Sequence, residues 1–186
     1  MDMRKGLRRT VDRRTLLRLA ALGLIGAGAL RASNVAASEQ PGDLDVYVAI
    51  PEDIAPDEYW VAVNLTEQAA VAMIGRDWVH RAWATTGTDG WSTPEGQFSI
   101  LYRVYNETMT SAALGIPPGP DSYVLKDVLF TQYFTWVGHA LHLNYWRRES
   151  VFGNQRTSHG CVGMRYTDAE FFWGHSRVGD RVVIFS

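Results

Sequence analysis

Cysteine is almost absent from this chain of 186 residues, because Cys161 is its single instance. A lone cysteine cannot form a disulfide within the chain, which excludes a small fold held together by disulfides. Most free cysteines are small buried hydrophobes, but a thiol with a histidine beside it can act as a nucleophile. Cys161 follows Ser158-His159-Gly160, and His139 and His142 precede it, so both interpretations stay open at this point.

The N-terminal part lacks an apolar run long enough to cross a membrane. Leu19–Leu30 has 12 uncharged residues, whereas a bilayer core requires about 20. A run of this length after a basic stretch, followed by the small residues Val35-Ala36-Ala37, is typical of a secretory signal peptide. The pair Arg13-Arg14 resembles the bacterial twin-arginine export motif. We therefore predict that residues 1–37 are an export signal that is cleaved, with an uncleaved membrane anchor as the alternative.

Positive charge is scarce beyond residue 37, where Lys126 is the only lysine. The signal segment holds eight Lys or Arg and two Asp or Glu, so the remaining chain has ten basic and 18 acidic residues and a formal charge of −8. Such a surface repels phosphate backbones, which argues against nucleic-acid binding. Residues 38–58 are interpreted as a polar leader, and residues 59–186 as a single domain.

Most of this domain has the sequence pattern of β-strands. Three segments, Trp60–Leu65, Ala69–Ile74 and Trp78–Thr85, are predicted to form an antiparallel meander. Further strands are expected at Gln97–Val104, Val128–Val137, Ala140–Asn144 and Arg181–Phe185. The segment Asn106–Ser122 is expected to be an irregular lid or binding loop, because three prolines interrupt its second half. One helix is predicted from the capping box Thr167-x-x-Glu170.

Three interpretations of the histidines near Cys161 compete. In the first, a histidine lowers the thiol pKa and Cys161 attacks an acyl carbonyl. In the second, His139, His142, His159 and Cys161 bind zinc, although residues three apart on a strand face opposite ways, which disfavours His139 and His142 as joint ligands. In the third, the histidines are structural and the domain only binds a ligand.

Several motifs together resemble the catalytic signature of the L,D-transpeptidase (YkuD-type) family. That signature is a histidine followed, about fifteen residues later, by Ser/Thr-His-Gly-Cys, and fifteen residues separate His142 from Ser158 here. The resemblance covers roughly residues 59–186. It includes Gly138-x-Ala140-Leu141-His142-x-x-Tyr145-Trp146, Phe152-Gly153, Thr86-Gly87, Thr93-Pro94-Glu95-Gly96-Gln97-Phe98 and Asp168-Ala169.

The resemblance implies a mainly β, sandwich-like domain with one or two short helices and a catalytic loop near the C-terminus. It implies an exported bacterial enzyme that acts on peptidoglycan stem peptides, both donor and acceptor, through a cysteine thioester and without metal or cofactor. The product would be a 3→3 cross-link; an L,D-carboxypeptidase using the same thioester, or a non-catalytic wall-binding module, is the alternative. We expect a monomer without a stable membrane anchor once the signal is removed.

The resemblance also implies roles for individual residues. Cys161 would be the nucleophile and His142 the general base and acid, oriented by a backbone carbonyl. Ser158 and His159 would shape the site, with the amides of Gly160 and Cys161 as oxyanion donors.

Two positions depart from the family pattern. The family commonly has Asn or Arg where Gly163 stands, and often Gly where Leu143 stands. Arg165 is therefore proposed to bind a substrate carboxylate, and Tyr145 and Trp146 to wall the donor groove. The histidines assigned to structural roles are His80, His139 and His175.

Overall fold

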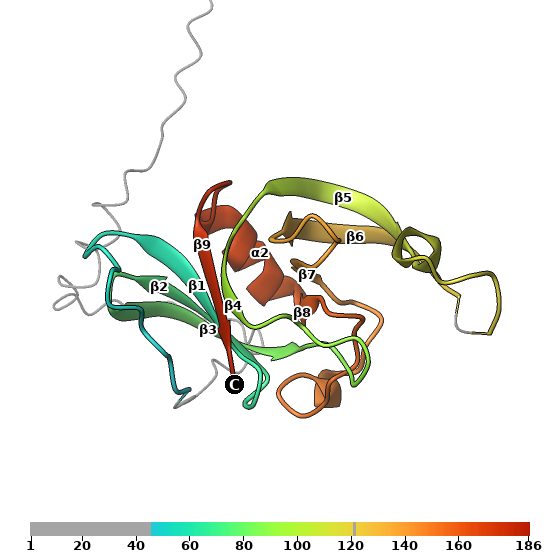
Figure 1. Cartoon of the computed structure of the whole chain (residues 1–186), viewed down its shortest axis with the longest axis horizontal. Coiled ribbons are helices and arrows are strands. Elements are labelled where there is room, and N and C mark those ends of the chain that lie inside the picture. The colour runs from blue at the N-terminus through green and yellow to red at the C-terminus, as the bar shows by residue number, and fades with distance from the viewer. Residues whose placement is uncertain (1–45, 121) are drawn as a thin grey trace, which may run out of the picture. The chain divides into compact units, whose positions relative to one another are not determined.

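The computed structural model describes residues 46–120 and 122–186, so the predicted signal segment 1–37 lies outside the described residues (Figure 1). Within these residues, nine strands form one sheet in the order β4-β9-β1-β2-β3-β8-β7-β6-β5. They are β1 (Tyr59–Asn64), β2 (Ala69–Ile74), β3 (Asp77–Thr85), β4 (Gly96–Ser99), β5 (Tyr102–Thr110), β6 (Val124–Tyr133), β7 (Ala140–Leu143), β8 (Val162–Met164) and β9 (Arg181–Phe185).

Helical structure is limited. The described residues contain one α-helix, α2 (Tyr166–His175), and two short 3-10 turns, η1 (Ser111–Leu114) and η2 (Glu149–Val151). No helix within 46–120 or 122–186 is long and apolar enough to cross a bilayer. The predicted mainly β fold is confirmed, and its sandwich takes the form of one strongly curled sheet whose two halves share β3.

The predicted meander of β1, β2 and β3 is confirmed. Ala62 pairs with Val71, and Ala70 pairs with Ala82, both in antiparallel register. The C-terminal strand β9 pairs in parallel with β1, on the side of β1 opposite to β2. Strand β1 is therefore central, and all six of its residues are buried.

Alternate side chains of β1 enter two different cores, as the period of two along a strand requires. Val61 and Val63 pack in the larger core together with Phe172 of α2. Trp60 faces the smaller core, which Ile54 of the segment before β1 helps to cover. Helix α2 packs against β3, β6, β7 and β8, so the larger core joins both halves of the curled sheet.

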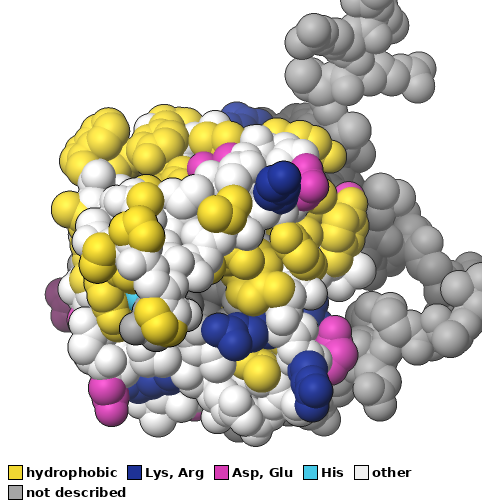
Figure 2. Space-filling model, turned by 90° about the vertical axis from the view of Figure 1, so that its right-hand side faces the viewer, with side chains coloured by type: hydrophobic (Ala, Val, Ile, Leu, Met, Phe, Trp, Pro, Cys, Tyr) yellow, Lys and Arg dark blue, Asp and Glu magenta, His cyan; other side chains and the backbone are white. Residues whose placement is uncertain are grey.

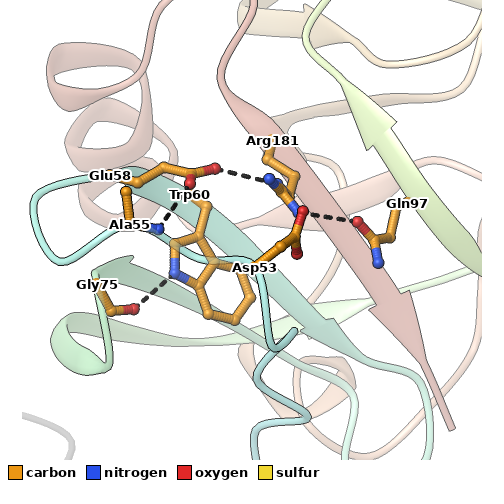
Figure 3. A network of polar contacts seen from close by, with 7 residues as sticks. All are labelled: Asp53, Ala55, Glu58, Trp60, Gly75, Gln97 and Arg181. Carbon is orange, nitrogen blue, oxygen red and sulfur yellow. Dashed lines mark hydrogen bonds and ion pairs between the residues drawn. The ribbon is translucent and has the colours of Figure 1, made fainter.

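The described part of the polar leader is bound to the sheet by a polar network (Figure 3). The guanidinium of Arg181 on β9 donates to Asp53 at 2.8 Å, to Glu58 at 3.0 Å and to Gln97 of β4 at 3.0 Å. Below it, the indole N–H of Trp60 donates to the carbonyl oxygen of Gly75 at 2.9 Å. At the other end of the segment, the Asn64 side chain at the end of β1 donates to the Tyr47 carbonyl oxygen at 3.2 Å. Residues 46–58 therefore run along the smaller core, to which Val46 and Ile54 belong.

The prediction of one strand at Gln97–Val104, followed by an irregular Asn106–Ser122, is wrong in two respects. The chain changes partners at its middle: the N–H of Ile100 donates to Asp180 beside β9, and the N–H of Leu101 donates to Tyr133 of β6. Strand β5 then continues to Thr110, paired with β6 as a long hairpin. Strand β5 is held by its backbone pairing with β6 and not by a buried apolar face. Its polar residues therefore lack the alternation of apolar and polar residues from which strands are predicted.

The predicted helix is confirmed, but its predicted capping box is wrong. Helix α2 begins at Tyr166, its N-cap is Arg165, and no side chain caps it. Thr167 is therefore already inside the first turn. The Asp168 carboxylate lies 2.9 Å from Nε2 of His80 on β3, which ties the start of the helix to the sheet.

Candidate active site

The register of two central strands brings Cys161 and His142 to one face of the sheet. Strands β7 and β8 are parallel, and His142 pairs with Gly163. Cys161 lies two residues before Gly163, so its side chain points to the same side. Both residues line a cavity of about 340 Å³ between the β5–β6 hairpin, β7 and the loop before β8. Figure 2 shows the face on the hairpin side, where some histidine surface lies between hydrophobic side chains.

The Cys161 thiol is held by backbone groups. Its Sγ donates to the carbonyl oxygen of Gly138 at 3.5 Å. Burial raises the pKa of this thiol to about 11; the Ala140 amide opposes that shift and the Glu107 carboxylate adds to it. The residue as a whole keeps partial exposure towards the cavity. Cys161 is therefore a protonated thiol at neutral pH, unless a base takes the proton.

His142 is suited to be that base. It is buried, and its Nδ1 lies 2.7 Å from the carbonyl oxygen of Leu143. Since a carbonyl can only accept, Nδ1 carries the proton and Nε2 is left as the acceptor. Burial lowers the pKa of His142 to about 4, against a smaller raising effect of the Leu143 carbonyl. The Trp146 ring stacks on the imidazole with centroids 5.7 Å apart.

Ser158 organises the loop that carries Cys161. Its hydroxyl donates to the Cys161 carbonyl oxygen at 2.6 Å and accepts from the Gly160 N–H at 3.1 Å. Gly160 has a φ of 107°, and a Cβ there would lie 2.5 Å from the His139 ring. Only glycine fits this position without strain. Because the Gly160 N–H is already bonded, its predicted role as an oxyanion donor is not available in this conformation.

A second loop, residues 87–93, supports the loop that carries Cys161. The Thr93 hydroxyl donates to the Gly160 carbonyl oxygen at 2.9 Å and accepts from the Gly87 N–H at 2.9 Å. The Ser158 carbonyl oxygen accepts from the Thr88 N–H at 3.0 Å. Thr93 and Gly87 belong to motifs that the sequence identifies as family-like, but their function as a brace was not predicted.

The other predicted site residues are divided between the cavity and its surroundings. His159 lines the cavity, with its ring 4.9 Å from that of Trp91. Trp146 also lines it, whereas Tyr145 is outside the lining and donates its hydroxyl to the Lys126 carbonyl oxygen at 2.6 Å. His139 is outside too, and its Nδ1 lies 3.1 Å from the Thr135 hydroxyl.

Arg165 does not line the cavity. Its guanidinium is paired with the Glu149 carboxylate and lies over the Phe152 ring. The arginine that does line the cavity is Arg147, whose guanidinium donates to the Thr157 carbonyl oxygen at 3.0 Å. A substrate carboxylate in the cavity would therefore meet Arg147 before Arg165.

Asn144 explains why glycine stands at position 163. A Cβ on Gly163 would lie 2.5 Å from Nδ2 and 2.8 Å from Cβ of Asn144. Asn144 is 3% exposed, it lines the cavity, and its Oδ1 is buried without a hydrogen-bond partner among the described residues. A carboxamide from the residue that follows β7 thus occupies the space next to Gly163. No pattern in the sequence selects Asn144 as a site residue.

The cavity residues that were missed include Glu107 on β5 and Tyr133 on β6. The Tyr133 hydroxyl lies 3.0 Å from each oxygen of the Glu107 carboxylate. Within the part of the chain that is described, no three His, Cys, Asp or Glu side chains gather closely enough to hold a metal ion.

Comparison with known proteins points to one family. A family model for the L,D-transpeptidase catalytic domain, named YkuD, matches residues 58–184. The probable L,D-transpeptidase 3 of Mycobacterium tuberculosis (strain ATCC 25618 / H37Rv) is 30% identical over 102 residues, which are 54% of this chain and 37% of that protein. L,D-transpeptidase 1 of the same strain is 27% identical over 101 residues, 54% of this chain and 40% of that protein. The chain therefore spans less than half the length of these relatives.

Solved structures show the same fold. An L,D-transpeptidase from Mycobacterium smegmatis superposes with a TM-score of 0.66 at 24% identity, over 69% of this chain and 59% of that chain. L,D-transpeptidase 3 of Mycobacterium tuberculosis, in complex with a faropenem-derived adduct, superposes with a TM-score of 0.64 at 24% identity, over 69% and 60% of the two chains.

Proposed function

Since the chain belongs to the L,D-transpeptidase catalytic-domain family, YkuD, we propose that it is a cysteine acyltransferase that forms a thioester on Cys161 from a peptidoglycan stem peptide. The observation that carries this proposal is the cavity that Cys161 shares with a buried, neutral His142 whose proton is fixed on Nδ1. A thiol and a free imidazole nitrogen on one face are the two groups that acyl transfer through a thioester requires.

The first step transfers the donor to the enzyme. The Cys161 sulfur attacks the carbonyl carbon of the amide after the third residue of the donor stem, while its proton passes to Nε2 of His142. The carbonyl oxygen takes the negative charge, and we assign its stabilisation to the Cys161 N–H, because Ser158 accepts the Gly160 N–H. The C–N bond then breaks, the departing D-residue takes the proton from His142, and a thioester remains.

The second step releases the donor to an acceptor. The side-chain amine of a second stem attacks the thioester carbon and gives a proton to His142. The C–S bond breaks, and the Cys161 sulfur recovers the proton as the 3→3 cross-linked product leaves. If water attacks instead, the product is a trimmed stem and the enzyme is an L,D-carboxypeptidase.

The pKa values of the two groups determine how the proton moves. With the Cys161 pKa at about 11 and the His142 pKa at about 4, the resting pair is uncharged between these values. A preformed thiolate–imidazolium pair is therefore not the resting state. Proton transfer accompanies sulfur attack, which is general-base catalysis.

The substrate class implies where the enzyme acts. Peptidoglycan lies outside the cytoplasmic membrane, and the predicted signal segment 1–37 would export the chain to that side. We propose that the exported domain acts as a monomer on donor and acceptor stems in the wall. Trp146 and His159, which line the cavity, would contact the donor.

The decisive test is the covalent adduct. We expect faropenem to add one covalent adduct to the wild-type protein by intact mass spectrometry, and none to Cys161→Ala. If the folded wild-type protein forms no adduct, the nucleophile assignment is contradicted. That result is the one expected of a non-catalytic wall-binding module. Muropeptide analysis with a tetrapeptide donor, with and without acceptor, then separates cross-linking from trimming.

A further inference from the structure

The cavity contains a carboxylate that the proposed thioester chemistry does not use. Glu107 lines the cavity together with Cys161, and the Tyr133 hydroxyl is 3.0 Å from both of its oxygens. A carboxylate can accept about four hydrogen bonds, and Glu107 is only partly buried. It therefore keeps acceptor capacity that can face a ligand in the cavity.

Within residues 46–120 and 122–186, no cationic side chain forms an ion pair with this carboxylate. The one arginine in the cavity lining, Arg147, donates to the Thr157 carbonyl oxygen instead. The cavity thus has a negative group on the β5–β6 hairpin and a positive group on the loop after β7.

The Glu107 charge opposes the chemistry of the free enzyme. It raises the pKa of Cys161, in addition to the larger effect of burial, and it also raises the pKa of Tyr133. A negative charge here disfavours both a thiolate and the oxyanion that forms beside it. This opposition ends when a cation binds to the carboxylate.

We propose that Glu107, held by Tyr133, is the subsite for a primary ammonium group of the acyl donor. The proposal rests on the proposed function and adds the group of the donor that is recognised. We assign the ammonium group to the donor rather than to the acceptor, because Glu107 affects the thiol before acylation. At that stage the donor is the molecule in the cavity. Binding of the ammonium would cancel the charge near Cys161, so recognition of the donor and activation of the thiol are coupled.

Tyr133 is a positioning residue in this arrangement. Burial raises the pKa of Tyr133, and the Glu107 charge raises it further. The hydroxyl therefore stays protonated and donates to the carboxylate. Its ring stacks on that of Tyr102 with centroids 4.4 Å apart, which fixes the direction of the hydroxyl.

The test compares two donors that differ only in charge. One is a stem tetrapeptide whose third residue has a free side-chain amine, and the other is the same peptide with that amine acetylated. Without acceptor, we expect kcat/KM for thioester formation to be about ten- to hundredfold higher for the free-amine donor, as for a hydrogen bond to a charged group. In Glu107→Gln this preference should disappear, through a loss on the free-amine donor and a gain on the acetylated donor, because the Glu107 charge no longer opposes attack by the thiol. Tyr133→Phe should reduce it.

The matched control is Asp127→Asn, which removes a carboxylate from the same hairpin but outside the cavity lining. It should keep the preference. Alkylation of Cys161 by iodoacetamide, a neutral reagent, should extend to lower pH in Glu107→Gln than in the wild type. The charged and titratable groups that line the cavity around this thiol are Glu107, Tyr123, Tyr133, His142, Arg147 and His159, and only Glu107 changes in this variant.

Each failure has a different meaning. If both donors acylate the wild-type protein at equal rates, or if Glu107→Gln keeps the preference, the ammonium subsite is wrong while the thioester function stands. If the preference appears only in the attack of an acceptor amine on a preformed thioester, the assignment to the donor is wrong. If neither donor nor faropenem acylates Cys161, the proposed function itself fails.

Discussion

Replacing Gly163 by alanine tests whether Asn144 determines the residue at this position. The added Cβ would lie 2.8 Å from Cβ and 3.1 Å from Cγ of Asn144, whereas carbon atoms in contact stay about 3.5–4.0 Å apart. A side-chain rotation can move Nδ2 of Asn144 away, but its Cβ is fixed to the backbone. Strands β7 and β8 would therefore have to separate by several tenths of an ångström.

The cost of that separation is of the kind found for overpacked cores, about 1–3 kcal/mol. Both residues are buried, so neighbouring groups leave little room for relaxation. We expect Gly163→Ala to lower the free energy of unfolding in urea by about 2 kcal/mol. Acylation by faropenem should slow as well, because β8 positions Cys161 relative to His142.

A double-mutant cycle identifies the cause. Asn144→Gly removes the contacting Cβ, so Gly163→Ala should cost little in that background, whereas Asn144→Ala keeps the Cβ and should rescue only part of the loss. The coupling energy should exceed about 0.5 kcal/mol, the value expected for residues in contact. A Gly163→Ala variant within about 0.5 kcal/mol of wild type would refute the steric explanation.

Three further predictions concern the base and the brace. Since protonated His142 cannot accept the thiol proton, kcat/KM should fall as pH decreases through about 4 and should be flat from about pH 5 to neutral. A decrease in kcat/KM centred near pH 6.5 would contradict a buried base. The folded state favours neutral His142, so the free energy of unfolding should fall by up to about 3 kcal/mol as pH decreases from 6.5 to about 4. The His142→Gln variant should lose this part of the pH dependence. Equal pH dependence of the two proteins in urea titrations would refute the prediction. Thr93→Val should remove the bonds to Gly160 and Gly87 and cost about 1–3 kcal/mol with slower acylation, and unchanged values for both would show that the brace is dispensable.

Sequence patterns were sufficient where burial alone selects the structure. The strands β1, β2 and β9 have β-branched, aromatic and small residues that are mostly buried, and their positions were predicted within a residue or two. Strand β3 was predicted equally well from its alternating pattern, although only its second half enters the core. Strand β5 was partly missed, because Asn106, Glu107 and Thr108 are polar and the strand is held by backbone pairing with β6. The capping box failed because helix α2 already begins at Tyr166, with Arg165 as its N-cap, so Thr167 lies inside the first turn.

The same distinction applies to the candidate site. Cys161, His142 and Ser158 lie in a local motif, and their arrangement follows from two adjacent strands. Glu107, Tyr133 and Arg147 line the cavity because the hairpin and the loop after β7 surround it, an arrangement that no local motif encodes. Arg165 is close to Cys161 in sequence, but the chain turns at the start of α2 and directs its side chain to Glu149.

The pKa of Cys161 connects the chemistry with the location that we propose. Sulfur is oxidised and alkylated as thiolate, so a lone cysteine outside the cell is protected while it stays protonated. Burial and the Glu107 charge both raise the Cys161 pKa, and the thiol donates a hydrogen bond to the Gly138 carbonyl oxygen. The same two effects would slow acylation if they persisted in the complex. A donor that fills the cavity and brings a cation to Glu107 removes the charge effect at the moment of attack, while His142 takes the proton. The resting enzyme would thus have an unreactive thiol, and the substrate itself would restore its reactivity.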